Sequence, residues 1–149
     1  MDNIKERIIS LVRSLDRPGK AAILNYLEQS NYFTCPCYGH HKERGGLARH
    51  SLEVYEHMRK FASGIPTDSM IVAALFHDLG KTRSSDWRKH GAHSLEILDT
   101  CGFELTPDER FAIGKHHDTS LTSYACFLRV ILSWGDCDST GRWKRKHSQ

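Results

Sequence analysis

Residues 67–81, TDSMIVAALFHDLGK, decide how this chain folds. The run MIVAALF inside this stretch is apolar on every side, which is typical of a helix buried at the centre of a domain. Thr67 is placed to cap the start of that helix, and Gly80 is placed to end it. We therefore predict a central buried helix that carries the adjacent pair His77 and Asp78 at its end.

Apolar residues recur at helical spacing on both sides of this stretch. The segment Thr106-Pro107-Asp108-Glu109 has a capping hydroxyl, a proline at the first helical position and a glutamate at the third, which predicts a capping box. The chain shows neither internal repeats nor a hairpin pattern. We predict an all-α, single-domain helical bundle. The other predicted helices cover about 4–15, 21–30, 47–61, 90–100, 107–117 and 123–136.

The composition excludes several classes of protein. A chain of 149 residues can bury one hydrophobic core, and 39% hydrophobic with 26% charged residues argues against disorder. The net charge of +3 is a mild basic bias and not that of an obligate nucleic-acid coat. The five cysteines are odd in number and irregularly spaced, which does not indicate a disulfide framework. The start MDNIKERIIS lacks the apolar centre of a signal peptide, and no apolar run approaches a membrane span, so we expect a cytoplasmic protein without membrane contact.

Histidine is the residue whose number stands out, with 10 in the chain. Several histidines and aspartates fall at or near the ends of predicted helices, where they can converge on one cavity. Buried imidazoles and carboxylates are costly unless they are paired or bind a metal, and together they suit Mn, Fe, Co, Ni or Zn. We interpret His57 and His147 as ordinary structural or surface residues. The candidates are His50, His77, Asp78, His90, His116, His117 and Asp136.

The order of these residues resembles the HD superfamily of metal-dependent phosphohydrolases. The segments that carry the resemblance are GGLARHSLEV, ALFHDLGK, KHGAHSLEIL, KHH and ILSWGDCD. In motif the chain is nearest to the HD domains of 3′–5′ exoribonucleases, which carry a His-His pair before the GGL, and to HD-GYP phosphodiesterases, although the GYP signature is missing. The resemblance implies N-terminal helices over 1–31 packed on a metal-binding core over 32–138, with a basic tail over 139–149. It also implies that the metal site lies where helix ends converge.

The resemblance assigns ligands to two divalent ions, drawn from Mn, Fe, Ni, Co, Zn or Mg. It implies a first metal held by His50, His77, Asp78 and Asp136. Asp78 would bridge to a second metal held by His90, His116 and His117. His93 remains an alternative to His90, and Asp138 remains an alternative to Asp136.

The implied function is hydrolysis of a phosphodiester or phosphomonoester, in a nucleotide or another phosphorylated small molecule, by a metal-activated water. Asp78 and Lys81 are the expected catalytic residues, and Arg49, Lys81 and His41 are expected to bind substrate. Two other readings stay open. One is a di-iron oxygenase on the same scaffold, and the other is a non-catalytic, metal-stabilised regulatory module.

Two further clusters carry weaker signals. Cys35 and Cys37, followed by His40 and His41, could form a structural zinc site, but the C-x-C spacing is atypical and a second pair is missing. We favour the rim of the active site for this loop. The tail GRWKRKHSQ is a weak indication of nucleic-acid binding, and the apolar face of the first helix could serve a homodimer.

Overall fold

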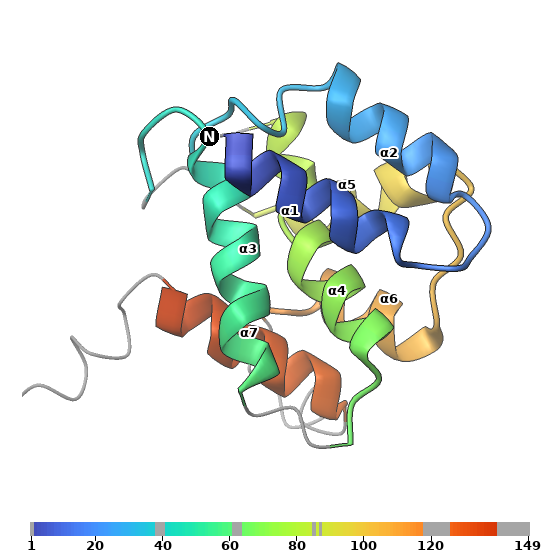
Figure 1. The fold of residues 1–149 in the computed structure, drawn as a ribbon. Coiled ribbons are helices and arrows are strands. Elements are labelled where there is room, and N and C mark those ends of the chain that lie inside the picture. Colours follow the sequence, from blue (N-terminus) through green and yellow to red (C-terminus); the bar gives the residue numbers. More distant parts are fainter. Residues whose placement is uncertain are drawn as a thin grey trace, which may run out of the picture.

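The computed structural model describes residues 2–37, 41–60, 64–84, 86, 88–117 and 126–139. Over these residues the chain is helical and contains no strand, which confirms the predicted all-α bundle. Figure 1 shows the arrangement of the helices. They are α1 (Asp2–Arg13), α2 (Lys20–Gln29), α3 (Gly46–Arg59), α4 (Thr67–Phe76), the 3-10 helix η1 (Leu79–Thr82), α5 (His90–Thr100), α6 (Pro107–Gly114) and α7 (Phe127–Ser139).

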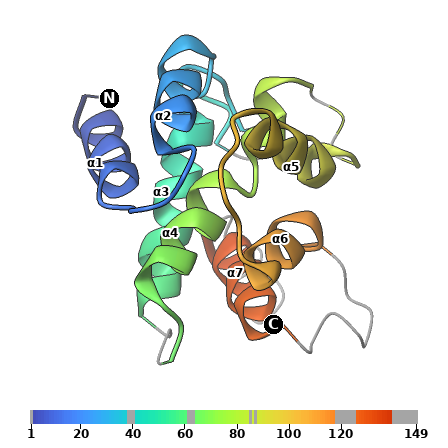
Figure 2. The ribbon, with the colours of Figure 1, turned by 90° about the vertical axis from the view of Figure 1, so that its right-hand side faces the viewer.

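Helix α4 forms the centre of the bundle, as its apolar sequence predicts. Every residue from Ser69 to Phe76 is buried. Helix α4 lies between α3 and α6 in Figure 1 and to the left of α6 and α7 in Figure 2, and it contacts α1, α3, α6 and α7. Its side chains therefore anchor the pair that follows it, His77 and Asp78.

The predicted ends of α4 need two corrections. Pro66, not Thr67, caps its start, and Thr67 is the first helical residue. The α-helix ends at Phe76 and does not continue to Gly80. Asp78 has φ −104° and ψ 12°, which breaks the α-helical path, and the backbone N–H of Lys81 donates to the Asp78 carbonyl to begin η1. This turn directs His77 and Asp78 out of the helix end.

Helix α7 lies against α3, and a glycine allows their close approach. A Cβ at Gly135 would lie 3.2 Å from the Val54 carbonyl oxygen and 3.1 Å from Cγ of Met58. Helix α7 spans Phe127–Ser139, so that Asp136 lies inside the helix and does not end it. The predicted start near 123 lies outside the described residues. The close packing places Asp136 beside the helix that carries His50.

A partly buried ion pair connects the N-terminal helices to the rest of the bundle. Nη1 and Nη2 of Arg17 lie 2.5 and 3.1 Å from the carboxylate oxygens of Glu109, and Oγ of Ser69 donates to the same carboxylate from 2.8 Å. The predicted capping box is confirmed, because Glu109 N–H donates to the Thr106 hydroxyl while Thr106 N–H donates to the Glu109 side chain. Burial raises the pKa of Glu109, but the hydrogen bonds from Arg17, Thr106 and Ser69 outweigh burial and hold it below its usual value.

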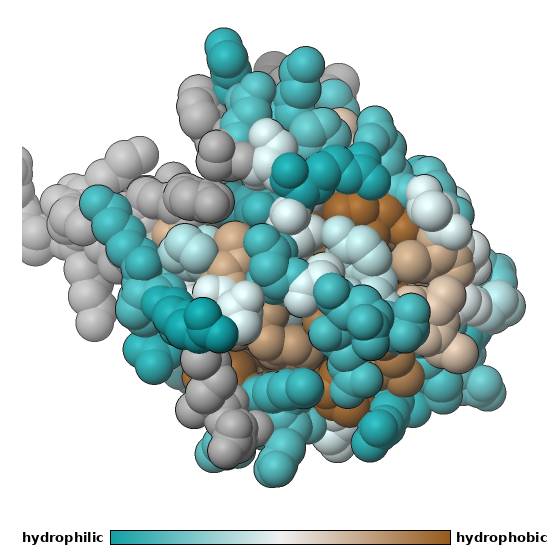
Figure 3. Space-filling view, turned by 90° about the horizontal axis from the view of Figure 1, so that it is seen from above, coloured by the Kyte–Doolittle hydropathy of each residue, from teal (hydrophilic) through white to brown (hydrophobic). Residues whose placement is uncertain are grey.

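The surface seen from the top of Figure 1 is mainly hydrophilic, with apolar patches between the polar side chains (Figure 3). Among the helices of the described ranges, none combines the length and the apolar composition that crossing a membrane requires. Except for Ser139, the predicted tail over 139–149 lies outside the described residues.

Candidate metal centre

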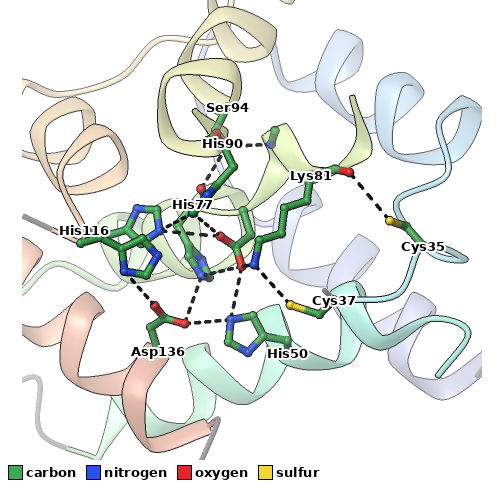
Figure 4. A network of polar contacts seen from close by, with 12 residues as sticks. Cys35, Cys37, His50, His77, Lys81, His90, Ser94, His116 and Asp136 are labelled. Atoms are coloured by element: carbon green, nitrogen blue, oxygen red, sulfur yellow. Dashed lines mark hydrogen bonds and ion pairs between the residues drawn. The ribbon is translucent and has the colours of Figure 1, made fainter. Parts of the chain in front are cut away.

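Imidazoles and carboxylates from separate helices meet at the C-terminal end of α4 (Figure 4). His77 and Asp78 come from the turn after α4, and η1 and α5 flank them on one side. At most 3% of each residue in the cluster is exposed. The other members are His50 from α3, His90 from α5, His116 from the turn after α6 and Asp136 from α7.

The carboxylate of Asp78 lies between two pairs of histidines. Its Oδ2 is 3.4 Å from Nε2 of His50 and 3.4 Å from Nε2 of His77. Its Oδ1 is 3.0 Å from Nε2 of His90 and 3.6 Å from Nε2 of His116. Each oxygen therefore faces its own half of the cluster, which is the geometry of a carboxylate that can bridge two ions.

Further donors complete the two halves. Oδ1 of Asp136 lies 3.0 Å from Nε2 of His50, in the first half. In the second half, Nε2 of His90 lies 2.9 Å from Nε2 of His116. The ring of His117 lies 4.2 Å from that of His116, and 47% of the His117 side chain is exposed. The second half thus borders solvent, whereas the first half is enclosed.

Two of the rings are oriented by the backbone of their own helices. Nδ1 of His77 lies 2.8 Å from the Ala74 carbonyl oxygen, and Nδ1 of His116 lies 2.7 Å from that of Ile113. Because a carbonyl oxygen only accepts, each Nδ1 carries the hydrogen, and in the neutral ring Nε2 presents a lone pair to the cluster. Histidines that bind metals are typically held in this way through the second ring nitrogen.

Ser94 joins the two halves of the centre, a role that sequence reasoning missed. Its Oγ accepts from Gly80 N–H at 2.8 Å and lies within 2.9 Å of the His77 and His90 carbonyl oxygens. A Cβ at Gly80 would lie 2.2 Å from the His90 carbonyl oxygen, so η1 packs on α5 at a distance that requires glycine. The available signal was a small polar residue one turn after His90.

The electrostatics of the cluster favour a bound cation. Burial alone raises the pKa of Asp78, but the positive charges of protonated His77 and of Lys81 outweigh burial and hold it well below its usual value. Burial lowers the pKa of His50, but hydrogen bonds to Asp136 and Asp78 outweigh burial and raise it to about 9. Burial lowers the pKa of His116. The buried carboxylate of Asp78 is thus kept charged beside imidazoles.

The donors present fit a divalent metal. Nε2 of His77 and Oδ1 of Asp78 are buried, and neither makes a hydrogen bond within the part of the chain that the structure describes. Such buried polar atoms are costly unless something else binds them. Imidazole mixed with carboxylate suits transition metals. Groups of three donors whose ligand atoms all lie within 4.8 Å of one another are His90/His116/His117, Cys37/His50/Asp78, His50/His77/Asp136 and His77/Asp78/His116.

The predicted substrate-binding residues lie at different distances from this cluster. Nζ of Lys81 is 2.8 Å from Oδ2 of Asp78, with only 9% of the side chain exposed. The ring of His41 lies 5.7 Å from that of His50, which places it at the rim. Arg49 is exposed and its guanidinium lies 3.2 Å from Glu43. A substrate contact by Arg49 therefore stays a prediction.

The structure distinguishes some of the alternatives that the sequence left open. His93 belongs to none of the donor groups found among the described residues, and its Cβ lies against Gly80. The side chain of Asp138 and the whole of His40 and His147 lie outside the described residues. No donor group within the described ranges contains both Cys35 and Cys37, although Cys37 alone joins His50 and Asp78. The loop was expected at the rim of the active site, but the contact of Cys37 with the donors His50 and Asp78 was not predicted.

Comparison with known proteins identifies the family of the chain. The family model of the HD domain matches residues 47–145, which is most of the chain. The chain belongs to the HD domain family, whose members are generally metal-dependent hydrolases. Searches of the curated proteins and of the solved structures returned no match. The nearness to the HD domains of exoribonucleases and to HD-GYP proteins stays a prediction.

Proposed function

We propose that this protein is a metal-dependent phosphohydrolase that cleaves a nucleotide or another phosphate ester with two divalent ions. The observation that carries the proposal is the placement of Asp78, with Oδ2 facing His50 and His77 and Oδ1 facing His90 and His116. A carboxylate placed in this way suits a two-metal centre for phosphoryl transfer.

Bound divalent ions supply a water of lowered pKa as the nucleophile and Lewis-acid stabilisation of phosphoryl oxygens. The protein residues hold the rest of the site in place. His77 and His116 are fixed by backbone carbonyls, so their ring nitrogens need no reorientation when substrate arrives. Asp78 and Asp136 supply the negative charge that offsets that of the ions.

Lys81 is the residue best placed to recognise the phosphate. Burial alone lowers its pKa, but the neighbouring Asp78 outweighs burial and raises it, so the ammonium stays charged. A charged donor next to the ions can neutralise a phosphoryl oxygen and stabilise the charge that develops there. A buried ammonium favours an anionic substrate, which is why we place hydrolysis ahead of the oxygenase alternative.

The proposal is tested with protein that has been stripped by a chelator and reloaded with one metal at a time. Phosphate or alcohol release is measured for phosphomonoesters, phosphodiesters and cyclic nucleotides. We expect activity only after reloading, and we expect Lys81→Met to lower kcat by about 10²–10³-fold, as for loss of one stabilising donor. Lys60→Met, at the exposed end of α3, is the matched control.

Two results would contradict the proposal. Bound iron with oxygen consumption, and without phosphate release from any ester, would identify an oxygenase. A fully metal-loaded protein that is inert in both assays would identify a regulatory module.

A further inference from the structure

Cys37 is a buried thiol beside the metal centre. We infer that the Cys37 thiolate is a ligand of the ion held by His50 and Asp78, so that this half of the centre selects zinc or cobalt over magnesium or manganese. The inference rests on the two-metal centre of the proposed function, but it does not depend on phosphohydrolase activity.

The three donor atoms are already close. Sγ of Cys37, a ring nitrogen of His50 and a carboxylate oxygen of Asp78 all lie within 4.8 Å of one another. A tetrahedral zinc site with bonds of about 2.0–2.3 Å places its ligand atoms about 3.3–3.8 Å apart. The distances between the ligand atoms therefore need to shorten by at most about 1.0–1.5 Å. All three residues are at most 1% exposed, so that water has little access to this group of donors.

The backbone holds Cys37 against the start of α3. Its N–H donates to the His41 carbonyl at 3.0 Å, and Leu47 N–H donates to the Cys35 carbonyl at 3.1 Å. A Cβ at Gly46 would lie 1.8 Å from the His41 carbonyl oxygen and 3.1 Å from the Cys37 nitrogen. Only glycine allows the loop to lie so near the helix, one turn before His50.

The Lys81 ammonium contacts both the Cys37 thiol and the carboxylate of Asp78. Nζ of Lys81 lies 3.4 Å from Sγ of Cys37 and 2.8 Å from Oδ2 of Asp78 (Figure 4). The sulfur thus faces the side of Asp78 that also faces His50 and His77. The competing explanation is that Cys37 serves only to position the Lys81 ammonium.

Cys35 provides a contrast within the same loop. Its Sγ lies 3.2 Å from the Pro36 carbonyl oxygen and 3.8 Å from that of Lys81. It belongs to no donor group among the residues that the structure describes. The two cysteines therefore have different surroundings, and Cys35→Ser is a matched control for Cys37→Ser.

Thiolate coordination has a chemical consequence. When the metal binds, the S–H bond of Cys37 breaks, a sulfur–metal bond forms and the proton passes to solvent. Thiolate is a soft ligand that suits zinc and other thiophilic ions, whereas magnesium and manganese prefer oxygen ligands. Loss of the sulfur should therefore weaken zinc binding much more than manganese binding.

The test is cobalt spectroscopy on the full chain under anaerobic conditions. Cobalt-loaded wild type should show a sulfur-to-cobalt charge-transfer band in the near ultraviolet. Cys37→Ser should keep the visible cobalt bands and lose the charge-transfer band, with a fall in zinc affinity of at least about tenfold and little change for manganese. Cys35→Ser, and Cys137→Ser next to Asp136, should both keep the band.

The inference is overturned if wild type binds cobalt without the band, or if Cys37→Ser retains it. Should Cys37→Ser fail to fold, X-ray absorption of zinc-loaded wild type replaces it, and a sulfur neighbour at about 2.3 Å is expected. Absence of that sulfur neighbour overturns the inference. Because these readouts need no phosphoester, an inactive protein with the sulfur signal contradicts only the proposed hydrolysis. A protein that binds neither cobalt nor zinc contradicts both proposals.

Discussion

Oδ1 of Asp78 lies 3.0 Å from Nε2 of His90, while Oδ2 of the same carboxylate faces His50 from 3.4 Å. One aspartate thus contacts both halves of the centre, whereas His90 contacts one. Substitutions at these two positions should consequently have different effects on metal content, and this difference separates a bridged two-metal centre from a single site.

His90→Ala should remove the second ion and leave the first, because His50, His77 and Asp136 lie in the other half. Elemental analysis after dialysis should find about half the metal of wild type. His93→Ala, one turn along α5, is the control and should keep the full content. The reverse pattern, with loss in His93→Ala alone, would show that the ligand on α5 has been misassigned.

Gly80→Ala should destabilise the protein, because the new Cβ would lie 2.2 Å from the His90 carbonyl oxygen. Overpacking of this kind costs about 1–3 kcal/mol, which urea unfolding can measure. Metal affinity should fall as well, since Gly80 follows the bridging Asp78 by two residues and packs against the carbonyl of His90. At Gly114 an added Cβ meets only the flexible end of Leu95, so Gly114→Ala should change stability much less.

Glu109→Gln should change the pH dependence of stability. The folded-state pKa of Glu109 lies below its usual 4.5, so its contribution is present above pH 4.5 and is lost as pH falls through the folded value. The variant should be less stable than wild type at neutral pH, by about 1.5–3 kcal/mol for the loss of the charged hydrogen-bond partner of Arg17. The difference between the two proteins should shrink in acid.

Both proteins are compared after chelator treatment. The titration of the metal-ligating side chains then changes their stability in the same way. Asp99→Asn, which breaks the exposed pair with Arg110, is the control and should cost no more than about 1 kcal/mol. A constant difference between wild type and Glu109→Gln down to low pH would show that the charge of Glu109 does not contribute.

Removal of metal should lower the melting temperature. An ion present at about 100 times its Kd stabilises the native state by about 2.7 kcal/mol, which corresponds to about 5–10 °C for a domain of this size. Calorimetry with and without chelator measures the shift. His50→Ala should show a smaller shift than wild type, whereas an unchanged shift would place the stabilising metal elsewhere.

The sequence predicted the fold well where periodicity and capping chemistry are local. Helix α5 begins at His90 and ends at Thr100 as its apolar spacing indicates, and the capping box at Thr106 forms as its motif predicts. The end of α4 was misplaced, because the α-helical path already breaks at Asp78, where the packing of η1 and its Gly80 on α5 sets the turn. The approach of Cys37 to Asp78 depends on how the loop packs on α3, and a single sequence contains no local signal of such a tertiary contact.

The most direct test of the bridged centre is the metal content of Asp78→Ala, counted per folded chain by elemental analysis. Asp99→Ala, an exposed aspartate on α5, is the matched control, and circular dichroism establishes that each variant is folded. The account predicts two ions per chain in wild type and in Asp99→Ala, and none retained by Asp78→Ala after dialysis. Retention of both ions by a folded Asp78→Ala would contradict the bridging role of this carboxylate.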